Sequence, residues 1–184
     1  MSSLISRKQR GLIEHTDGVV AMSELFAEQL GLEKEVAQDL CLAARLHDAG
    51  KAHPDFQQYL YGGDELAAAG GAILAKGNRF PTREARKRSG LPDGARHEVA
   101  SLRLAEAHPS FATAHDPELV LWLIGTHHGQ GRPLFPAALW PAPGDVFEAD
   151  LGGGPVGAKP ALTIPELTAR WLALRDAVHQ RYGP

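Results

Sequence analysis

The chain has 184 residues, of which 43% are hydrophobic and 22% are charged, and its formal net charge is -3 at pH 7. This length and composition predict one compact domain with its own core, and exclude disordered, collagen-like and coiled-coil proteins. The small net negative charge also argues against a protein coated in basic residues for bulk nucleic-acid binding.

Apolar residues recur at helical spacing along most of the chain, and no convincing strand-like alternation is found, so we predict an all-α fold. The first helix is predicted from about Leu12 to Leu30, with Gly31 as its C-terminal stop. Its buried stripe is expected to include His15 and four apolar residues, namely Leu12, Val19, Met22 and Phe26.

The second helix is predicted from about Lys34 to Ala49, where Gly50 ends it and Pro54 prevents its simple continuation. Beyond it, the segment from Gly62 to Gly94 is rich in alanine, glycine and charged residues. We predict an irregular excursion from the helical bundle in this segment, with one helical stretch inside it.

A basic strip lies between Lys76 and Arg96, where seven positive residues outnumber the acids Glu84 and Asp93. Its positive members are Lys76, Arg79, Arg83, Arg86, Lys87, Arg88 and Arg96. Such a strip can follow a phosphate backbone, but charge runs are commonly no more than solvated surface. Both interpretations remain open at this point.

Three further helices are predicted to begin near residues 96, 117 and 163. Asp116 is the expected N-cap of the second of these, while Thr163 and Glu166 are placed to form a capping box in the third. A glycine- and proline-rich loop from Gly131 to Pro160 separates the last two helices. The residues expected to be buried in the first and the third are Val99, Leu102, Ala105, Leu167, Trp171, Leu174, Val178 and Tyr182.

The single cysteine, Cys41, excludes both an internal disulfide and a cysteine-based zinc cluster. We therefore expect a reducing environment and a cytoplasmic protein. The first ten residues carry charge with no apolar stretch behind them, and no run of 18 apolar residues occurs anywhere in the chain. Neither a secretory signal peptide nor a membrane span is expected.

Nine histidines are present, and helix geometry turns five of them inward or places them at helix ends. These five are His15, His47, His97, His127 and His128. One histidine on an apolar face is usually a hydrogen-bonded core residue, but five buried imidazoles would each need partners for two ring nitrogens. A metal ion is the economical common acceptor. We expect the other four, His53, His108, His115 and His179, to lie on the surface.

Two of the candidate ligands are adjacent pairs, His47-Asp48 and His127-His128, and each is closely followed by glycine. Successive helical residues point about 100° apart, so neighbours can share a site only where a helix ends. The partial negative charge of a helix C-terminus favours a cation there. The carboxylate of Asp48 can bridge two ions, and imidazoles favour Mn, Fe, Co, Ni or Zn over Mg. The pattern indicates a mixed nitrogen and oxygen site that can be dinuclear.

The order His15, His47-Asp48, His97, His127-His128 resembles that of the HD superfamily of metal-dependent phosphohydrolases. The flanking residues are more specific, and they read Leu46-His47-Asp48-Ala49-Gly50-Lys51, Phe56-Gln57, Arg96-His97-Glu98 and Thr126-His127-His128-Gly129. Over roughly residues 11 to 182, this pattern is similar to the HD nuclease domain of the CRISPR-associated helicase-nuclease of type I systems.

This resemblance implies a helical nuclease that cuts single-stranded DNA in CRISPR interference. The strand would come from a helicase, after a guide-RNA surveillance complex has opened the duplex. One divalent ion would be held by His15, His47 and Asp48, and a second by Asp48, His97, His127 and His128. The ions would be Mn, Ni, Co or Fe, with Mg as a further option. Asp48 and Lys51 would be the catalytic residues, Lys51 adding positive charge near the scissile phosphate or the attacking water. Arg96 is a weaker candidate for the same role.

One feature of the family pattern is missing, because the family has a later aspartate in an Ala-Asp-x-x-Ala-Ser context and this chain has no such string. Asp176 is the nearest substitute, but it is predicted to face solvent. We therefore expect residues 1–184 to form a single HD nuclease domain that lacks a final C-terminal helix. No Gly-x-x-x-x-Gly-Lys-Ser/Thr phosphate loop occurs, so the helicase would be a separate subunit or another part of a longer fused chain.

Two other functions fit the same residues. The chain could be an HD phosphohydrolase of nucleotides or cyclic dinucleotides, which would need a closed pocket rather than a basic groove. It could also be a catalytically incomplete docking module that keeps the fold and binds metal poorly.

Overall fold

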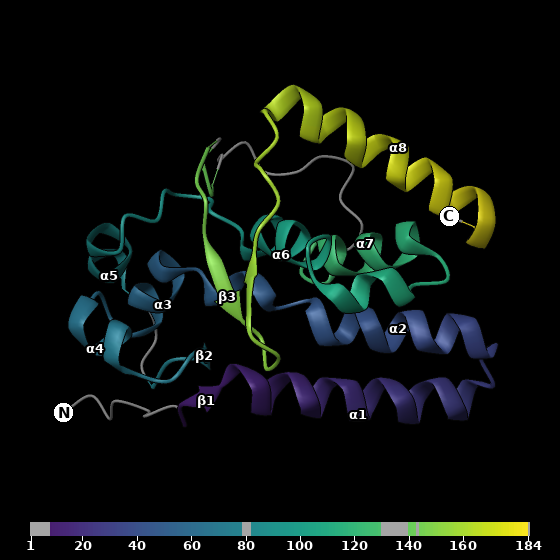
Figure 1. Ribbon diagram of the computed structural model, residues 1–184, viewed down its shortest axis with the longest axis horizontal. Helices are drawn as coiled ribbons and strands as arrows, with labels where there is room; N and C mark the ends of the chain where they lie inside the picture. The colour runs from purple at the N-terminus through teal and green to yellow at the C-terminus, as the bar shows by residue number, and fades with distance from the viewer. Residues whose placement is uncertain (1–7, 79–81, 130–139, 143, 184) are drawn as a thin grey trace.

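A computed structural model describes residues 8–78, 82–129, 140–142 and 144–183 of the chain. These residues are predominantly helical, which confirms the all-α prediction (Figure 1). The helices are α1 (Leu12–Leu30), α2 (Lys34–Leu46), α3 (Pro54–Leu60), α4 (Glu65–Gly70), α5 (Arg83–Arg88), α6 (His97–Ala105), α7 (Pro117–Thr126) and α8 (Ile164–Tyr182), with 3-10 segments η1 (Ala49–Ala52) and η2 (Pro109–Thr113). No described helix combines the length with the apolar composition that a membrane span requires.

The larger helices are stacked in layers, with α1 along the bottom of Figure 1, α2 above it, α6 and α7 next, and α8 at the top. Contacts join α1 to α2, α2 to α7, and α7 to both α6 and α8. One apolar cluster lies between α2, α6 and α7 and contains Leu46, Val120 and Ile124. Another lies between α7 and α8, where the rings of Trp122 and Trp171 stack 4.6 Å apart.

The bounds of α1 are those predicted, and Gly31 ends the helix with a φ of 62°. The predicted stripe is wrong at two positions, since Met22 and Phe26 are 47% and 51% exposed. The buried ridge is instead formed by Leu12, Thr16, Val20 and Ala27. Because α1 is the outermost layer and packs mainly on α2, only one narrow ridge of mostly small side chains is covered.

α2 ends at Leu46, three residues earlier than predicted, because Asp48 leaves the helical conformation with φ -100° and ψ 6°. The chain then forms η1, which packs closely on α6. The backbone N–H of Gly50 donates to the hydroxyl of Ser101 at 2.8 Å. A Cβ atom at Gly50 would lie only 2.1 Å from the backbone oxygen of His97. Gly50 is therefore required for close approach to α6 as well as for ending a helix.

Among the described residues, four short strands form two antiparallel ribbons that the sequence did not predict. They are β1 (Arg10–Gly11) with β2 (Leu74–Lys76), and β3 (Glu148–Asp150) with β4 (Pro155–Gly157). Strands of two or three residues are too short to show an alternating pattern. The first ribbon ties the predicted excursion to the start of α1, and the second lies in the stretch predicted to be a loop.

The excursion contains the two short helices α4 and α5, of which α5 is the helical stretch expected within the basic strip. Arg79 of that strip, residues 130–139 of the predicted loop and Pro143 lie outside the described residues. In α6, Ala105 is fully buried as predicted, whereas Val99 and Leu102 are only half-buried.

The predicted caps of the later helices are confirmed. The Asp116 side chain accepts hydrogen bonds from the backbone N–H groups of Glu118 and Leu119, and Thr163 forms a capping box with Glu166. Three of the five residues expected to be buried in α8 are buried, but Leu167 is half-buried and Tyr182 is 48% exposed. The Tyr182 hydroxyl donates to the Asp116 carboxylate at 3.0 Å, so this ring lies at the edge of the core.

Candidate metal centre

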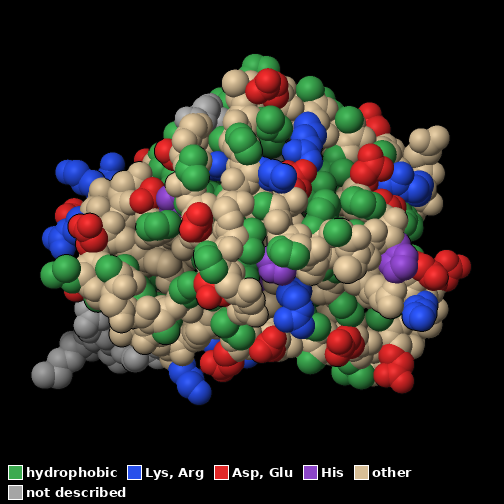
Figure 2. Space-filling model, in the orientation of Figure 1, with side chains coloured by type: hydrophobic (Ala, Val, Ile, Leu, Met, Phe, Trp, Pro, Cys, Tyr) green, Lys and Arg blue, Asp and Glu red, His purple; other side chains and the backbone are tan. Residues whose placement is uncertain are grey.

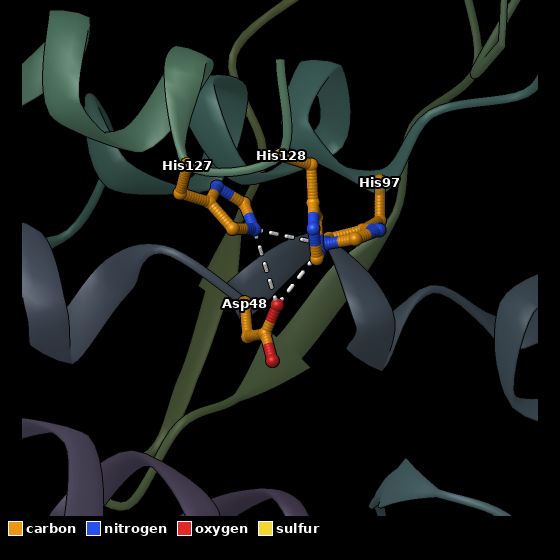
Figure 3. Close-up of side chains that lie close together, drawn as sticks. All are labelled: Asp48, His97, His127 and His128. Atoms are coloured by element: carbon orange, nitrogen blue, oxygen red, sulfur yellow. Dashed lines mark hydrogen bonds and ion pairs between the residues drawn. The ribbon is translucent and has the colours of Figure 1, made fainter. Parts of the chain in front are cut away.

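The five histidines singled out in the sequence gather around one carboxylate, that of Asp48, which is only 1% exposed. Figure 3 shows three of them, His97, His127 and His128, beside Asp48. They come from four separate parts of the chain. His15 lies on α1, His47 in the turn after α2, His97 at the start of α6, and His127 and His128 directly after α7. Packing of α1, α6 and α7 around the end of α2 therefore brings these side chains together.

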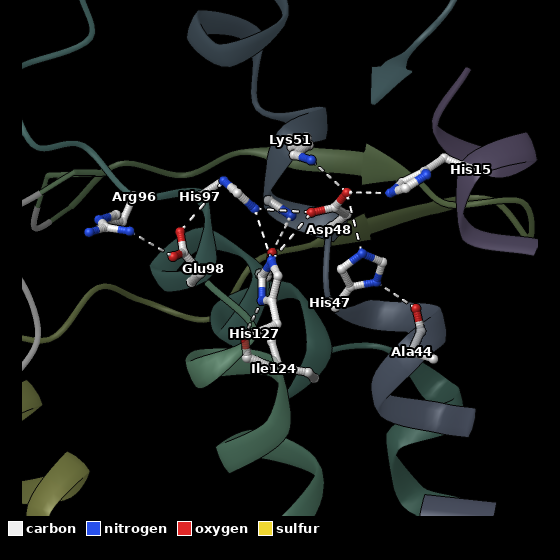
Figure 4. A network of polar contacts seen from close by, with 12 residues as sticks. His15, Ala44, His47, Asp48, Lys51, Arg96, His97, Glu98, Ile124 and His127 are labelled. Atoms are coloured by element: carbon white, nitrogen blue, oxygen red, sulfur yellow. Dashed lines mark hydrogen bonds and ion pairs between the residues drawn. The ribbon is translucent and has the colours of Figure 1, made fainter. Parts of the chain in front are cut away.

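The two carboxylate oxygens of Asp48 face different histidines (Figure 4). Oδ2 lies 3.2 Å from Nε2 of His15 and 3.4 Å from Nε2 of His47. Oδ1 lies 3.0 Å from Nε2 of His97 and 3.5 Å from Nε2 of His127. The side chain thus joins two potential ligand sets, one of His15, His47 and Asp48 and the other of Asp48, His97, His127 and His128.

The outer nitrogens of two rings are held by backbone carbonyl groups. Nδ1 of His47 donates to the Ala44 oxygen at 2.6 Å, and Nδ1 of His127 donates to the Ile124 oxygen at 2.7 Å. In a neutral ring the proton is then on Nδ1, so Nε2 points a lone pair toward the centre. Lone pairs that face a carboxylate need a proton or a cation between them.

Protons are held weakly at this centre. Burial lowers the pKa of both His15 and His97. Partial burial, together with the charges of the neighbouring His127 and His97, lowers the pKa of His128 to about 4. Burial alone would raise the pKa of Asp48, but its contacts with His127, His47 and His97 and the charge of Lys51 outweigh burial, so the pKa lies well below its usual value. At neutral pH the centre combines neutral imidazoles with an ionised carboxylate, which is the donor set of a divalent transition metal.

Two buried polar atoms of this centre lack a hydrogen bond within the described part of the chain, Oδ1 of Asp48 and Nδ1 of His15. A buried carboxylate oxygen without a hydrogen bond is costly unless a cation is bound to it. The position of Oδ1, facing the nitrogens of His97 and His127, therefore fits a metal ligand.

Lys51 lies on η1, one turn after Asp48, and its Nζ is 2.6 Å from Oδ2. Its side chain is only 12% exposed, so it is part of the centre and not a solvated lysine beyond a helix end. Arg96 does not face Asp48. Its guanidinium lies 3.3 Å from Oε1 of Glu98, and Oε2 of Glu98 lies 3.5 Å from Nδ1 of His97.

Glu98 is a site residue to which sequence reasoning gave no role. It is 4% exposed and contacts the outer nitrogen of His97, in the way that a carboxylate orients a metal-ligating histidine. The sequence feature that could have identified Glu98 is its position directly after a candidate ligand, in the first turn of a helix.

His128 lies at the rim of the centre and is exposed, with its ring centroid 5.1 Å from that of His97.

The remaining four histidines lie away from the centre, but the prediction that all four are surface residues is wrong for His53. That side chain is 7% exposed, because it caps α3 and packs against the rings of Trp140 and Phe147. Asp176 faces solvent as predicted and pairs with Arg175 at 2.7 Å. It belongs to neither ligand set found among the described residues.

The lowered histidine pKa values predict a pH-dependent stability of the metal-free protein. His128 has a pKa of about 4 in the folded chain and about 6.5 when unfolded, so the unfolded state binds more protons between these values. The free energy of unfolding should therefore decrease as pH falls from about 6.5 toward 4. Urea titrations with EDTA at pH 7.5 and 5 measure this, and His128→Gln should reduce the loss. An equal decrease in the free energy of unfolding of the wild-type chain and His128→Gln would contradict the lowered pKa of His128.

Comparison with known proteins gives an independent result. The family model described as "Cas3, HD domain" matches residues 12–144, which include all five histidines, Asp48 and Lys51. The search of curated proteins and the search of solved structures each found no match. The family match confirms the resemblance drawn from the His-Asp pattern and its flanking residues. The chain therefore belongs to the Cas3 HD-domain family, and it is an HD nuclease domain of the Cas3 type.

Proposed function

We propose that the chain cleaves phosphodiester bonds of single-stranded DNA with two divalent transition-metal ions, as part of CRISPR interference. The observation that carries this proposal is the Asp48 carboxylate, whose two oxygens face separate sets of imidazole nitrogens. A bridging carboxylate is the usual device for keeping two ions at a short distance in nucleases and phosphatases.

One ion would be held by His15, His47 and Asp48, and the other by Asp48, His97, His127 and His128. Mn, Ni, Co or Fe suit this nitrogen-rich set, and Mg is a further option. When bound, the ions would supply Lewis-acid activation of water and would stabilise the charge that develops on the phosphate.

Neighbouring residues orient the histidine rings of this site, and Lys51 adds a positive charge to it. The backbone oxygens of Ala44 and Ile124 fix the rings of His47 and His127, and Glu98 orients His97. Lys51 holds a positive charge beside Oδ2 of Asp48. From there, its ammonium group can hydrogen-bond to a phosphate oxygen as negative charge grows in the transition state.

The proposed partners are single-stranded DNA, a helicase that is separate or fused, and a CRISPR surveillance complex, in the cytoplasm. We propose that residues 1–184 act together as one nuclease domain.

Figure 2 shows basic side chains gathered at the left of the molecule, over the region of α5. Two arginines of this strip already contact other side chains of the chain, since Arg86 stacks on Tyr59 and Arg88 pairs with Glu84. The strip therefore supports the substrate assignment less strongly than the metal centre does.

The test uses the purified chain with Mn, and end-labelled single strands of about 50 nucleotides beside mononucleotides and cyclic dinucleotides. Cleavage of the long strands, with the small molecules left intact, is expected. Hydrolysis of the small molecules alone would establish a nucleotide phosphohydrolase instead. Binding of fewer than two ions at millimolar Mn or Ni, with no hydrolysis of any of these substrates, would indicate a docking module.

Lys51→Ala should reduce strand cleavage by about 10²- to 10³-fold, because a preorganised charge at the phosphate is lost. Metal content should remain at two ions per chain, since the ammonium group is not a ligand. Inductively coupled plasma mass spectrometry and single-turnover cleavage measure the two quantities. Lys51→Arg is the matched variant and should retain part of the activity. An unchanged rate for Lys51→Ala would remove Lys51 from the catalytic residues.

A further inference from the structure

The ribbon of β1 and β2 lies at the start of α1, next to the helix turn that carries His15 (Figure 1). Arg10 on β1 and Lys76 on β2 are directly opposite residues in this ribbon. Residues directly opposite in an antiparallel pair place their side chains on the same face, and like charges there are destabilising. A pair of cations in this position is unfavourable, and Glu14, which lies 3.6 Å from Arg10, offsets only the charge on the Arg10 side.

The backbone of β2, which carries Lys76, is held by hydrogen bonds with a buried side chain as well as by its pairing with β1. The buried side chain of Gln57 accepts a hydrogen bond from the Leu74 N–H at 2.8 Å and donates to the Leu74 oxygen at 3.0 Å. The same amide donates to the backbone oxygen of Lys51 at 2.6 Å. One side chain, 6% exposed, therefore links the backbone of η1, which carries Lys51, to the backbone of β2.

The residues on either side of Lys76 also hold it in place. Leu74 and Ala75 are 2% and 3% exposed, and a Cβ atom at Gly77 would lie 2.2 Å from the backbone oxygen of Leu60. Lys76 itself is exposed. Within the described residues, no carboxylate lies at ion-pair distance from its ammonium group. Lys76 is thus an unpaired lysine on a strand whose backbone is joined, through the Gln57 side chain, to the backbone of Lys51.

The electrostatic influence of Lys76 extends to the centre, since its charge helps to lower the pKa of His15, as does that of Lys51. Arg10 has an incomplete set of partners. Its Nε lies 3.6 Å from a carboxylate oxygen of Glu14, and that buried nitrogen has no hydrogen bond within the described part of the chain. Lys76 is therefore the cation of the ribbon that is free for an anionic ligand close to the metal centre, whereas Arg10, whose side chain is 41% exposed, is shared with Glu14.

We propose that Lys76, with Arg10 opposite it, binds a phosphate of single-stranded DNA next to the phosphate at the metal centre, and that Gln57 is the positioning residue for Lys76 and Lys51. This inference rests on the proposed nuclease function and adds a second point at which the strand is held. Two phosphates fixed on one strand would set its direction through the site, because the contacts on the two sides of the scissile bond differ.

The first test measures binding of a fluorescent oligothymidine by anisotropy, in EDTA, over a range of salt concentrations. Lys76→Ala should weaken binding about three- to tenfold and reduce the salt slope by about 0.7, the value for one phosphate contact with a single strand. Lys76→Arg should restore both. Lys34→Ala is the matched control, because this exposed lysine lies at the opposite end of α2 from His47, and it should change neither quantity.

The role of Gln57 is tested by Gln57→Leu, alone and combined with Lys76→Ala. If Gln57 acts by holding the ribbon, Gln57→Leu alone reduces the salt slope, and the double variant shows no further decrease. Further decrease in the double variant would contradict the positioning role. If Gln57→Leu fails to fold, the Lys76 variants still decide whether the phosphate contact exists.

The two proposals fail in different ways. A wild-type chain that loads metal but neither binds nor cuts long strands would overturn the nuclease function. A wild-type chain that cuts them, with Lys76→Ala equal to it in affinity and salt slope, would overturn the phosphate contact alone. Metal content is measured for every variant and should stay at the wild-type value.

Discussion

Asp48→Asn is expected to abolish the metal centre and to reduce strand cleavage by roughly three orders of magnitude or more. Asp48 faces both ligand sets, so its loss weakens the binding of two ions at once. The amide has nearly the same size as the carboxylate, but its nitrogen is a donor and cannot bind a cation. Metal content and single-turnover cleavage are the measurements, and both should fall together.

Asp176→Asn is the control for this variant, because Asp176 is the aspartate nearest to the position of the late family ligand. Its side chain is 67% exposed and pairs with Arg175. The substitution should change neither metal content nor cleavage. A loss of activity in Asp176→Asn, or full activity in Asp48→Asn, would show that the ligand assignment is wrong.

Gly50→Ala is expected to have the largest effect on stability. A Cβ atom there would lie 2.1 Å from the backbone oxygen of His97, 2.5 Å from the backbone nitrogen of Ser101 and 2.8 Å from the Ala100 side chain. Backbone atoms cannot rotate away, so η1 and α6 must separate. Overpacking costs about 1–3 kcal/mol, and the approach to two backbone atoms puts this variant at the upper end, near about 3 kcal/mol. In a chain of this size that corresponds to a decrease in Tm of roughly 6 to 12 °C.

The same displacement should also reduce metal affinity, because η1 directly follows Asp48 and α6 begins at His97. Thermal unfolding and metal titration measure the two effects. Gly70→Ala is the matched control, since no atom lies within 4 Å of a Cβ atom at that helical position. It should leave Tm nearly unchanged. A Tm for Gly50→Ala within 1 °C of wild type would contradict the close approach of η1 to α6.

Periodicity and caps predicted the helices well because these signals are local. The bounds of α1, the Asp116 cap of α7 and the Thr163 capping box all depend on residues within one or two turns. Burial was predicted less well because it depends on which neighbour a helix meets. Met22 and Phe26 share a face with His15, yet α2 covers the adjacent ridge through Thr16 and Val20.

The candidate site was predicted at the level of residue types and order, but its contacts were not. Convergence of the five histidines was expected because helix geometry turns them inward or places them at helix ends. The roles of Glu98 and Gln57 depend on tertiary neighbours that no spacing reveals. The same applies to Asp39, a buried acid on α2 that accepts hydrogen bonds from the backbone N–H groups of His115 and Asp116 before α7.

Anomalous diffraction from crystals soaked in Mn shows whether Asp48 joins two cation sites. We expect two anomalous peaks about 3.5–4 Å apart, one beside Oδ2 with His15 and His47 and one beside Oδ1 with His97 and His127. No peak within coordination distance of Asp48, or ions bound elsewhere while the histidines keep their present contacts, would contradict it.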